Sequence, residues 1–200
     1  MTKIKICGLR RSQDIMMANR YKPDFVGFII DFPKSHRSVT SEEVTKLRSF
    51  LTEEIPIVGV FVNQPIEKVI LLLKDRIIDI AQLHGNESPE YIKQVKDETG
   101  CQVIKAFEVK SEDDIIKADE SPADYLLLDQ GKGGGETFDW SLIKEKPAKP
   151  FFLAGGLKPE NLQQAIDEVH PWAVDISSGV ETDGVKDEEK IKEVIRIVRR

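Results

Sequence analysis

The sequence has little cysteine and histidine, and it contains no long apolar run. Its two cysteines, Cys7 and Cys101, lack the spacing of metal ligands, so neither a zinc site nor a disulfide framework is predicted. No apolar stretch approaches the roughly 20 residues of a membrane-spanning helix, and the first residues lack a signal-peptide core. We therefore expect a cytoplasmic protein with no membrane partner.

An excess of basic residues is also missing. The chain has 29 Lys and Arg against 35 Asp and Glu, a net charge of −6, so repulsion from phosphates argues against a nucleic-acid partner. With 40% hydrophobic and 32% charged residues, the composition is that of an ordinary globular protein. The length of 200 residues predicts one domain, 1–200, and we expect a monomer in preference to a homodimer.

Short apolar runs and amphipathic segments alternate along the chain. The runs predict strands at residues 3–7, 25–30, 57–62, 78–83, 103–107, 125–128, 151–154 and 173–176. The amphipathic segments predict helices at residues 12–20, 41–52, 65–74, 89–99, 112–118, 140–145, 159–169 and 187–198. Strict alternation indicates an α/β protein with a parallel sheet covered by helices. Eight such units favour a single (β/α)8 TIM barrel over a doubly wound open sheet, which rarely needs eight even repeats in 200 residues.

Polar and small residues gather where the predicted strands end, and barrel enzymes carry their active sites at the carboxyl ends of the strands. Gly155 and Gly156 follow the seventh strand, and Ser177, Ser178 and Gly179 follow the eighth. Glycine lets a backbone approach an anion closely, and N–H groups at a helix start bind phosphate. These five residues predict a phosphate site. The alternative is that both loops are merely tight turns.

Cys7 and Asp129 end the first and sixth predicted strands, where a base and an acid can face a bound molecule. Strand periodicity puts Lys5 and Cys7 on one face, and a nearby ammonium favours the thiolate. We therefore hypothesise that Lys5 helps Cys7 to act as a base. The alternatives are a buried structural cysteine, a lysine paired with a buried carboxylate, and an aspartate that merely ends a strand before the glycines of 131–135.

Three further polar residues lie at the end of the fourth strand or just after the second and fourth strands. Arg37 can hold a substrate carboxylate bidentately, although a solvated loop arginine is the alternative. Gln82 and His84 lie on one strand face and can line a pocket, but histidine often serves structure instead.

Eight short motifs occur in order along the chain. They are KICGL at 5–9, GFII at 27–30, KSHR at 34–37, GVFVN at 59–63, QLHG at 82–85, FDW at 138–140, LAGGL at 153–157 and DISSG at 175–179. Together they resemble the phosphoribosylanthranilate isomerase family of tryptophan biosynthesis over essentially the whole chain. Each motif alone is weak, whereas the ordered set is specific.

The resemblance implies an Amadori rearrangement of N-(5-phosphoribosyl)anthranilate to 1-(2-carboxyphenylamino)-1-deoxyribulose 5-phosphate. It implies a phosphosugar ligand and neither cofactor nor metal. Asp129 is then the general acid that protonates the furanose oxygen, and Cys7 is the general base that removes the C2′ proton. Arg37 resembles the residue that holds the anthranilate carboxylate, and Asp175 matches an aspartate at the other side of the substrate. The phosphate site of the family matches Gly156, Ser178 and Gly179.

One departure from the family falls within residues 132–135, where glycine replaces a hydroxyl residue. We predict that this glycine run covers the substrate while the later loops bind its phosphate. Another phosphosugar barrel enzyme is an alternative, but an epimerase would need metal-binding histidines and acids, and indole-glycerol-phosphate synthase a lysine acid and a longer N-terminal extension. A non-catalytic phospho-ligand binder is a further alternative, against which the presence of both Cys7 and Asp129 argues.

Overall fold

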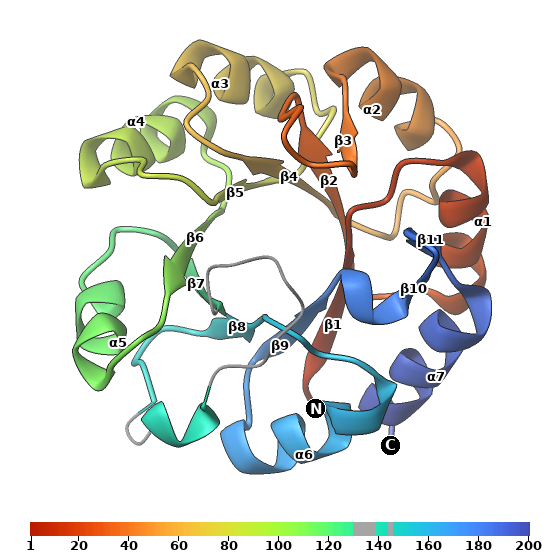
Figure 1. Cartoon of the computed structure of the whole chain (residues 1–200). Coiled ribbons are helices and arrows are strands. Elements are labelled where there is room, and N and C mark those ends of the chain that lie inside the picture. Colours follow the sequence, from red (N-terminus) through yellow and green to blue (C-terminus); the bar gives the residue numbers. More distant parts are fainter. Residues whose placement is uncertain (130–138, 144–145) are drawn as a thin grey trace.

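The computed structural model describes residues 1–129, 139–143 and 146–200. Eight parallel strands form a ring that is seen end-on in Figure 1. They are β1 (Lys3–Cys7), β2 (Phe25–Ile30), β4 (Ile57–Phe61), β5 (Ile80–Leu83), β6 (Val103–Glu108), β7 (Tyr125–Asp129), β8 (Phe151–Leu153) and β9 (Ala173–Ile176). The ring closes because β1 pairs with β9 on one side and with β2 on the other. The predicted (β/α)8 barrel is confirmed.

The helices surround this ring on its outside (Figure 1). They are α1 (Ser12–Tyr21), α2 (Ser41–Arg48), α3 (Ile66–Lys74), α4 (Pro89–Thr99), α5 (Glu112–Asp119), α6 (Pro159–Val169) and α7 (Glu188–Val198). Several begin at the polar residues that signal a helix start in the sequence: the side chain of Thr40 accepts the Glu43 N–H before α2, and Ser88 accepts the Tyr91 N–H before α4.

The prediction of a regular helix at 140–145 is wrong. The described part forms one turn of 3-10 helix, η1 (Trp140–Leu142), which Asp139 caps by accepting the Ser141 N–H. Ile143 leaves the helical conformation with φ −88° and ψ 60°. Residues 144–145 lie outside the described part, and Pro147 disfavours helix in the residue before it. The helix predicted at 41–52 also ends early, at Arg48.

Four short elements lie between the main ones and were not predicted. Strand β3 (Ser38–Val39) extends the sheet beside β2, and η2 (Ser178–Val180) follows β9. Strands β10 (Glu181–Thr182) and β11 (Val185–Lys186) form a small antiparallel hairpin after η2. These elements lie in the loops that carry four of the predicted site residues, Arg37, Ser177, Ser178 and Gly179.

Two apolar cores follow from strand periodicity. Residues such as Ile4 and Ile6 point outward and pack under the helices. Inside the barrel the lower layer is aromatic, with the rings of Tyr125 and Trp172 stacked at 4.6 Å. This apolar layer leaves the carboxyl-terminal end of the barrel interior to polar groups. No helix in the described part of the chain is long and apolar enough to cross a membrane.

Candidate active site

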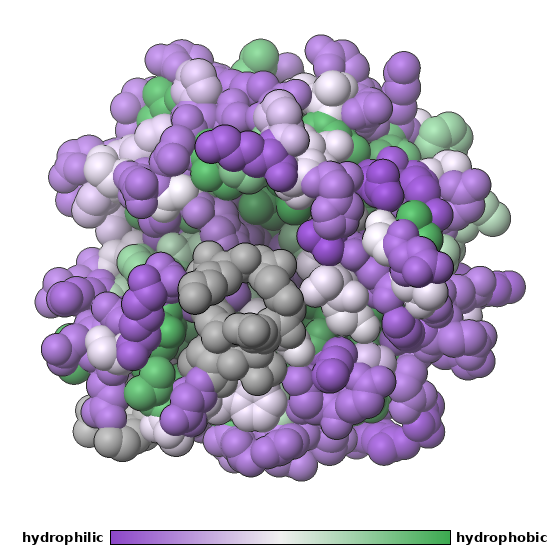
Figure 2. Space-filling model, in the orientation of Figure 1, coloured by the Kyte–Doolittle hydropathy of each residue, from purple (hydrophilic) through white to green (hydrophobic). Residues whose placement is uncertain are grey.

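The predicted site residues meet at the carboxyl ends of the strands. Cys7 ends β1, Asp129 ends β7, and Gln82 and Asp175 lie in β5 and β9. Because all these strands are parallel, the ends lie on one side of the barrel. The face seen in Figure 2 is hollowed near the barrel axis, where hydrophilic atoms lie beside hydrophobic ones.

The base candidate, Cys7, lies in a buried charged cluster. Cys7 is 7% exposed, and the fully buried Lys5 amine contacts both carboxylate oxygens of Asp175 at 2.9 Å. A Cβ atom on Gly27 of the neighbouring strand would lie 2.7 Å from the Cys7 Sγ and 3.0 Å from the Lys5 Nζ. Glycine at this position therefore leaves the room that the thiol and the ammonium need, which the sequence pattern alone did not explain.

The charges around Cys7 oppose one another. Burial raises the pKa of the Cys7 thiol, the Lys5 ammonium opposes this rise, and the Asp175 carboxylate adds to it; the pKa of the thiol is raised overall. Burial lowers the pKa of Lys5, but Asp175 and Cys7 raise it more, so that Lys5 stays an ammonium. The hypothesised effect of Lys5 on the thiol is present, but burial outweighs it. The alternative pairing of Lys5 with a buried carboxylate is also present.

Arg37 lies against the same cluster, and Glu181 holds it in place. The Nε and Nη2 atoms of Arg37 donate to the two Glu181 oxygens at 2.8 and 2.7 Å, and Lys186 donates to the same carboxylate at 2.7 Å. A Cβ atom on Gly8 would lie 2.6 Å from the Arg37 Cδ and 3.1 Å from the Ser177 Oγ, so both side chains pack over the residue after Cys7. Sequence reasoning missed Glu181 and Lys186, because a charged segment after the last strand is typical of a solvated turn.

Because of the Glu181 carboxylate, the folded protein is expected to lose stability in acid. Arg37 and Lys186 lower its pKa to about 2 from the ordinary 4.5, against the opposing effect of burial. A lowered carboxyl pKa stabilises the fold above pH 4.5, and this stabilisation is lost as the pH falls toward 2. We expect Glu181→Gln to lower the free energy of unfolding in urea by up to about 3 kcal/mol at pH 7, and by far less near pH 2.5. An equal loss at both pH values would contradict the assignment.

The acid candidate, Asp129, lies beside His84. The Nε2 atom of His84 is 3.4 Å from the Asp129 Oδ2, although β6 separates the strands that carry the two residues. The Gln82 amide nitrogen lies 3.1 Å from the other ring nitrogen, Nδ1. In this orientation of the amide its nitrogen donates to Nδ1, and the matching tautomer of a neutral ring has its proton on Nε2, the atom nearer Asp129. The Gln82 Oε1 atom is then buried without a partner among the described residues. The structure thus brings together three predicted residues, with His84 in contact with the acid.

The two predicted phosphate loops also lie together. Gly155 and Gly156 have φ values of +87° and +61°, which favour glycine. A Cβ atom on Gly179 would lie 1.8 Å from the Leu157 carbonyl oxygen, so the loops after β8 and β9 pack backbone against backbone. The Ser177 Oγ is buried and has no partner among the described residues. Gly179 is therefore required for loop packing, whether or not it also touches a ligand.

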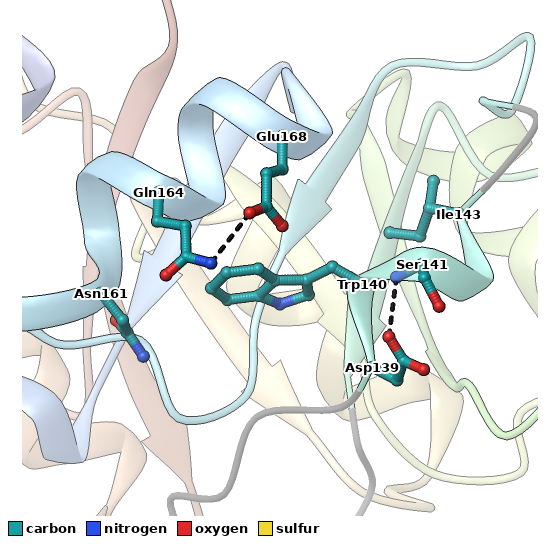
Figure 3. A pocket seen from close by; sticks show the side chains of 7 residues that line it. All are labelled: Asp139, Trp140, Ser141, Ile143, Asn161, Gln164 and Glu168. Atoms are coloured by element: carbon teal, nitrogen blue, oxygen red, sulfur yellow. Dashed lines mark hydrogen bonds between the residues drawn. The ribbon is translucent and has the colours of Figure 1, made fainter.

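A pocket of about 510 Å³ lies between η1 and α6, outside the ring of strands. Figure 3 shows the Trp140 indole extending from η1 toward Gln164 and Glu168 on α6. Its described lining residues include none of the predicted site residues. The predicted cover at 131–135 lies outside the described residues. In the part of the chain that the structure describes, no group of three or more His, Cys, Asp or Glu is placed to hold a metal ion.

The geometry defines the class of protein first: a (β/α)8 barrel with a buried thiol, a carboxyl group and two glycine loops at the carboxyl ends of its strands. Comparison with known proteins gives the family. The profile of the family described as N-(5'phosphoribosyl)anthranilate (PRA) isomerase matches residues 4–197. The chain belongs to this family.

Individual relatives agree over their full length. An N-(5'-phosphoribosyl)anthranilate isomerase from Clostridium acetobutylicum is 46% identical, with 100% of this chain and 99% of the relative covered. The monomers generated from a dimeric Thermotoga maritima enzyme are 36% identical with a TM-score of 0.88, covering 100% of this chain and 99% of theirs. A family structure in complex with reduced 1-(o-carboxyphenylamino)-1-deoxyribulose 5-phosphate is also 36% identical, with a TM-score of 0.87 and the same coverage.

Proposed function

We propose that this chain is an N-(5'-phosphoribosyl)anthranilate isomerase that performs an Amadori rearrangement in the synthesis of tryptophan. Membership of the family over residues 4–197 carries this proposal. The relative with a bound reduced product analogue supports the same substrate class, an anthranilate joined to a sugar phosphate. The chain acts as one domain, 1–200.

The reaction needs one proton donor and one proton acceptor. Asp129 gives its proton to the furanose ring oxygen, the C1′–O bond breaks, and the nitrogen lone pair forms a C1′=N double bond. The Cys7 thiolate then takes the C2′ proton, the released electron pair forms a C1′=C2′ bond, and the C1′=N pair returns to nitrogen to give an enolamine. This enolamine tautomerises to the ketone as the C2′ hydroxyl loses its proton and C1′ gains one. Lys5 lies beside the thiol and supports its anionic form.

The other site residues hold the two ends of the substrate. Arg37 binds the anthranilate carboxylate, since Glu181 uses its Nε and only one of its two terminal nitrogens. Gln82 and His84 line the pocket between these ends, and Asp175 lies at the other side of the substrate. Its phosphate lies in the loops formed by Gly155, Gly156, Ser177, Ser178 and Gly179.

The test of this proposal is direct. We expect the purified chain to consume enzymatically generated phosphoribosylanthranilate, followed by loss of the substrate's fluorescence. The same anthranilate riboside without its phosphate should be a poor substrate, because the two glycine loops would have no anion to bind. Phosphosugar binding without turnover would favour the non-catalytic binder instead.

Assembly and location remain predictions. A monomer is sufficient for the proposed site, because every residue assigned to it comes from one chain. The Thermotoga maritima relative is described as dimeric. Light scattering coupled to size-exclusion chromatography will distinguish a monomer of this chain from a dimer. The expected cytoplasmic location is open to test by cell fractionation.

A further inference from the structure

A buried lysine on β6 has no part in the proposed reaction. Lys105 is 6% exposed, and its amine donates to the carbonyl oxygens of Leu83 at 3.2 Å, Gly85 at 2.6 Å and Ala106 at 3.3 Å. Its only described charged partner is Glu87, at 3.3 Å. Burial lowers the pKa of Lys105, and Glu87 opposes this. A lysine so enclosed by carbonyl groups fixes the backbone that carries them.

Glu87 extends the same network to a third strand end. One of its carboxylate oxygens accepts the Asn63 N–H at 2.8 Å, and the other accepts the Gly85 N–H at 2.9 Å. The Glu87 side chain is 1% exposed. The loops after β4 and β5 are therefore tied to each other through Glu87 and to β6 through Lys105.

The residue between the two clamped carbonyl groups is His84. Lys105 binds the carbonyl group of the peptide unit before His84, through Leu83, and the Gly85 carbonyl group one residue further on. Glu87 accepts the Gly85 N–H of the peptide unit that directly follows His84. Its ring can then lie with Nδ1 on the Gln82 amide and Nε2 at 3.4 Å from the Asp129 Oδ2. In the tautomer that matches the Gln82 contact, Nε2 carries the proton and faces the carboxyl group with a donor.

We propose that Lys105 is a positioning residue, which through the loop at 83–85 holds the His84 imidazole against Asp129. The inference rests on the proposed function, in which Asp129 donates a proton to the furanose oxygen. A carboxylate remains after that transfer, and an N–H donor beside it stabilises the charge as it forms. A donor held in place in advance does this without reorganisation during the reaction. Lys105 therefore acts on turnover rather than on substrate binding.

The chain offers a matched control. Lys96 also joins a backbone carbonyl and a carboxylate, because its amine contacts the Pro122 oxygen at 2.9 Å and the Asp124 Oδ1 at 2.8 Å. Asp124 directly precedes β7, at the end of that strand opposite Asp129. Lys96→Met thus removes a comparable interaction at the other end of the barrel.

The experiment compares wild type, Lys105→Met and Lys96→Met by steady-state kinetics and by the ¹⁵N resonances of the His84 ring. We expect Lys105→Met to lower kcat at least tenfold with KM changed less than threefold, and to shift the His84 resonances. Lys96→Met should leave kcat within twofold and those resonances unchanged. The wild-type ring should show one tautomer with its proton on Nε2. A mixture of tautomers in wild type, or equal kcat in the two variants, would overturn the proposal.

Two further measurements keep the outcome decisive. If Lys105→Met does not fold, the double variant Lys105→Met/Glu87→Gln removes both buried charges, and the same loss of kcat is expected of it. In a His84→Gln background, Lys105→Met should lower kcat by less than twofold more, because its effect passes through the ring. An undiminished effect there would refute the route through His84. Absence of wild-type turnover would refute the proposed function instead. The His84 resonances would still show whether Lys105 positions the His84 ring.

Discussion

Asp129→Asn is expected to lower kcat by about 10²- to 10⁴-fold, with KM changed only a few-fold. Asparagine has nearly the same size and can still accept a hydrogen bond from the His84 ring, whose Nε2 lies 3.4 Å from the carboxylate. It has no acidic proton to give to the furanose oxygen. The ring-opening step therefore loses its acid while the phosphate loops and Arg37 keep their contacts. The measurement is the fluorescence assay at saturating substrate.

The control for this variant lies just before the same strand, at its opposite end. Asp124 precedes β7, and its carboxylate accepts the Val103 N–H at 2.8 Å and contacts Lys96. Asp124→Asn should leave kcat within twofold of wild type, although it weakens the Lys96 ion pair. Activity in Asp129→Asn above a tenth of wild type would remove Asp129 as the general acid.

The barrel could be predicted from the sequence because each strand corresponds to one short apolar run of neighbouring residues. The strand residues 3–7, 25–30 and 173–176 match the observed bounds. Burial on both faces makes such strands continuous apolar runs between polar loops. The segment at 140–145 failed because its few apolar residues fit a helix turn, whereas Asp139 and Ile143 limit the helix to three residues. Local propensity did not decide that length.

The predicted strand-end residues lie together because the parallel strands bring their carboxyl ends to one side. Their partners could not be predicted in the same way. Glu181 contacts Arg37 across 144 positions, and Lys5 contacts Asp175 across 170, so both pairs depend on closure of the barrel. Lys105 and Glu87 resemble ordinary charged residues in the sequence, and only their burial reveals their role.

The two ends of the barrel interior separate stability from chemistry. The aromatic layer around Trp172 fills the amino-terminal end. At the other end, Lys5, Asp175 and Lys105 are buried charges whose desolvation destabilises the fold unless each keeps its partner. Such an arrangement is costly for stability alone. It is expected where charges must be positioned for a reaction.

Cys7→Ser is expected to lower kcat/KM by about 10²- to 10⁴-fold. A serine hydroxyl stays protonated near neutral pH, so it cannot act as the base that removes the C2′ proton. The substitution changes one atom, so the packing against Gly27 and Lys5 is kept. The matched control is Cys101→Ser, since Cys101 is the other free cysteine and lies half-buried, where its thiol donates to the Thr99 carbonyl. That variant should keep full activity.

The pH dependence of the wild type gives this prediction a second readout. Burial raises the pKa of the Cys7 thiol above its ordinary value, so only a small fraction is thiolate at neutral pH and that fraction grows as the pH rises. The thiolate acts only while Asp129 carries its proton, so the active free enzyme holds one proton between these two groups. kcat/KM should therefore stay level on the alkaline side until the pH passes the raised pKa of the thiol, and it should fall above that pH as the last proton is lost. Cys7→Ser should lose this fall along with its activity. A wild-type kcat/KM that climbs steadily from pH 7 to 10, or an active Cys7→Ser, would contradict this pair of acid and base.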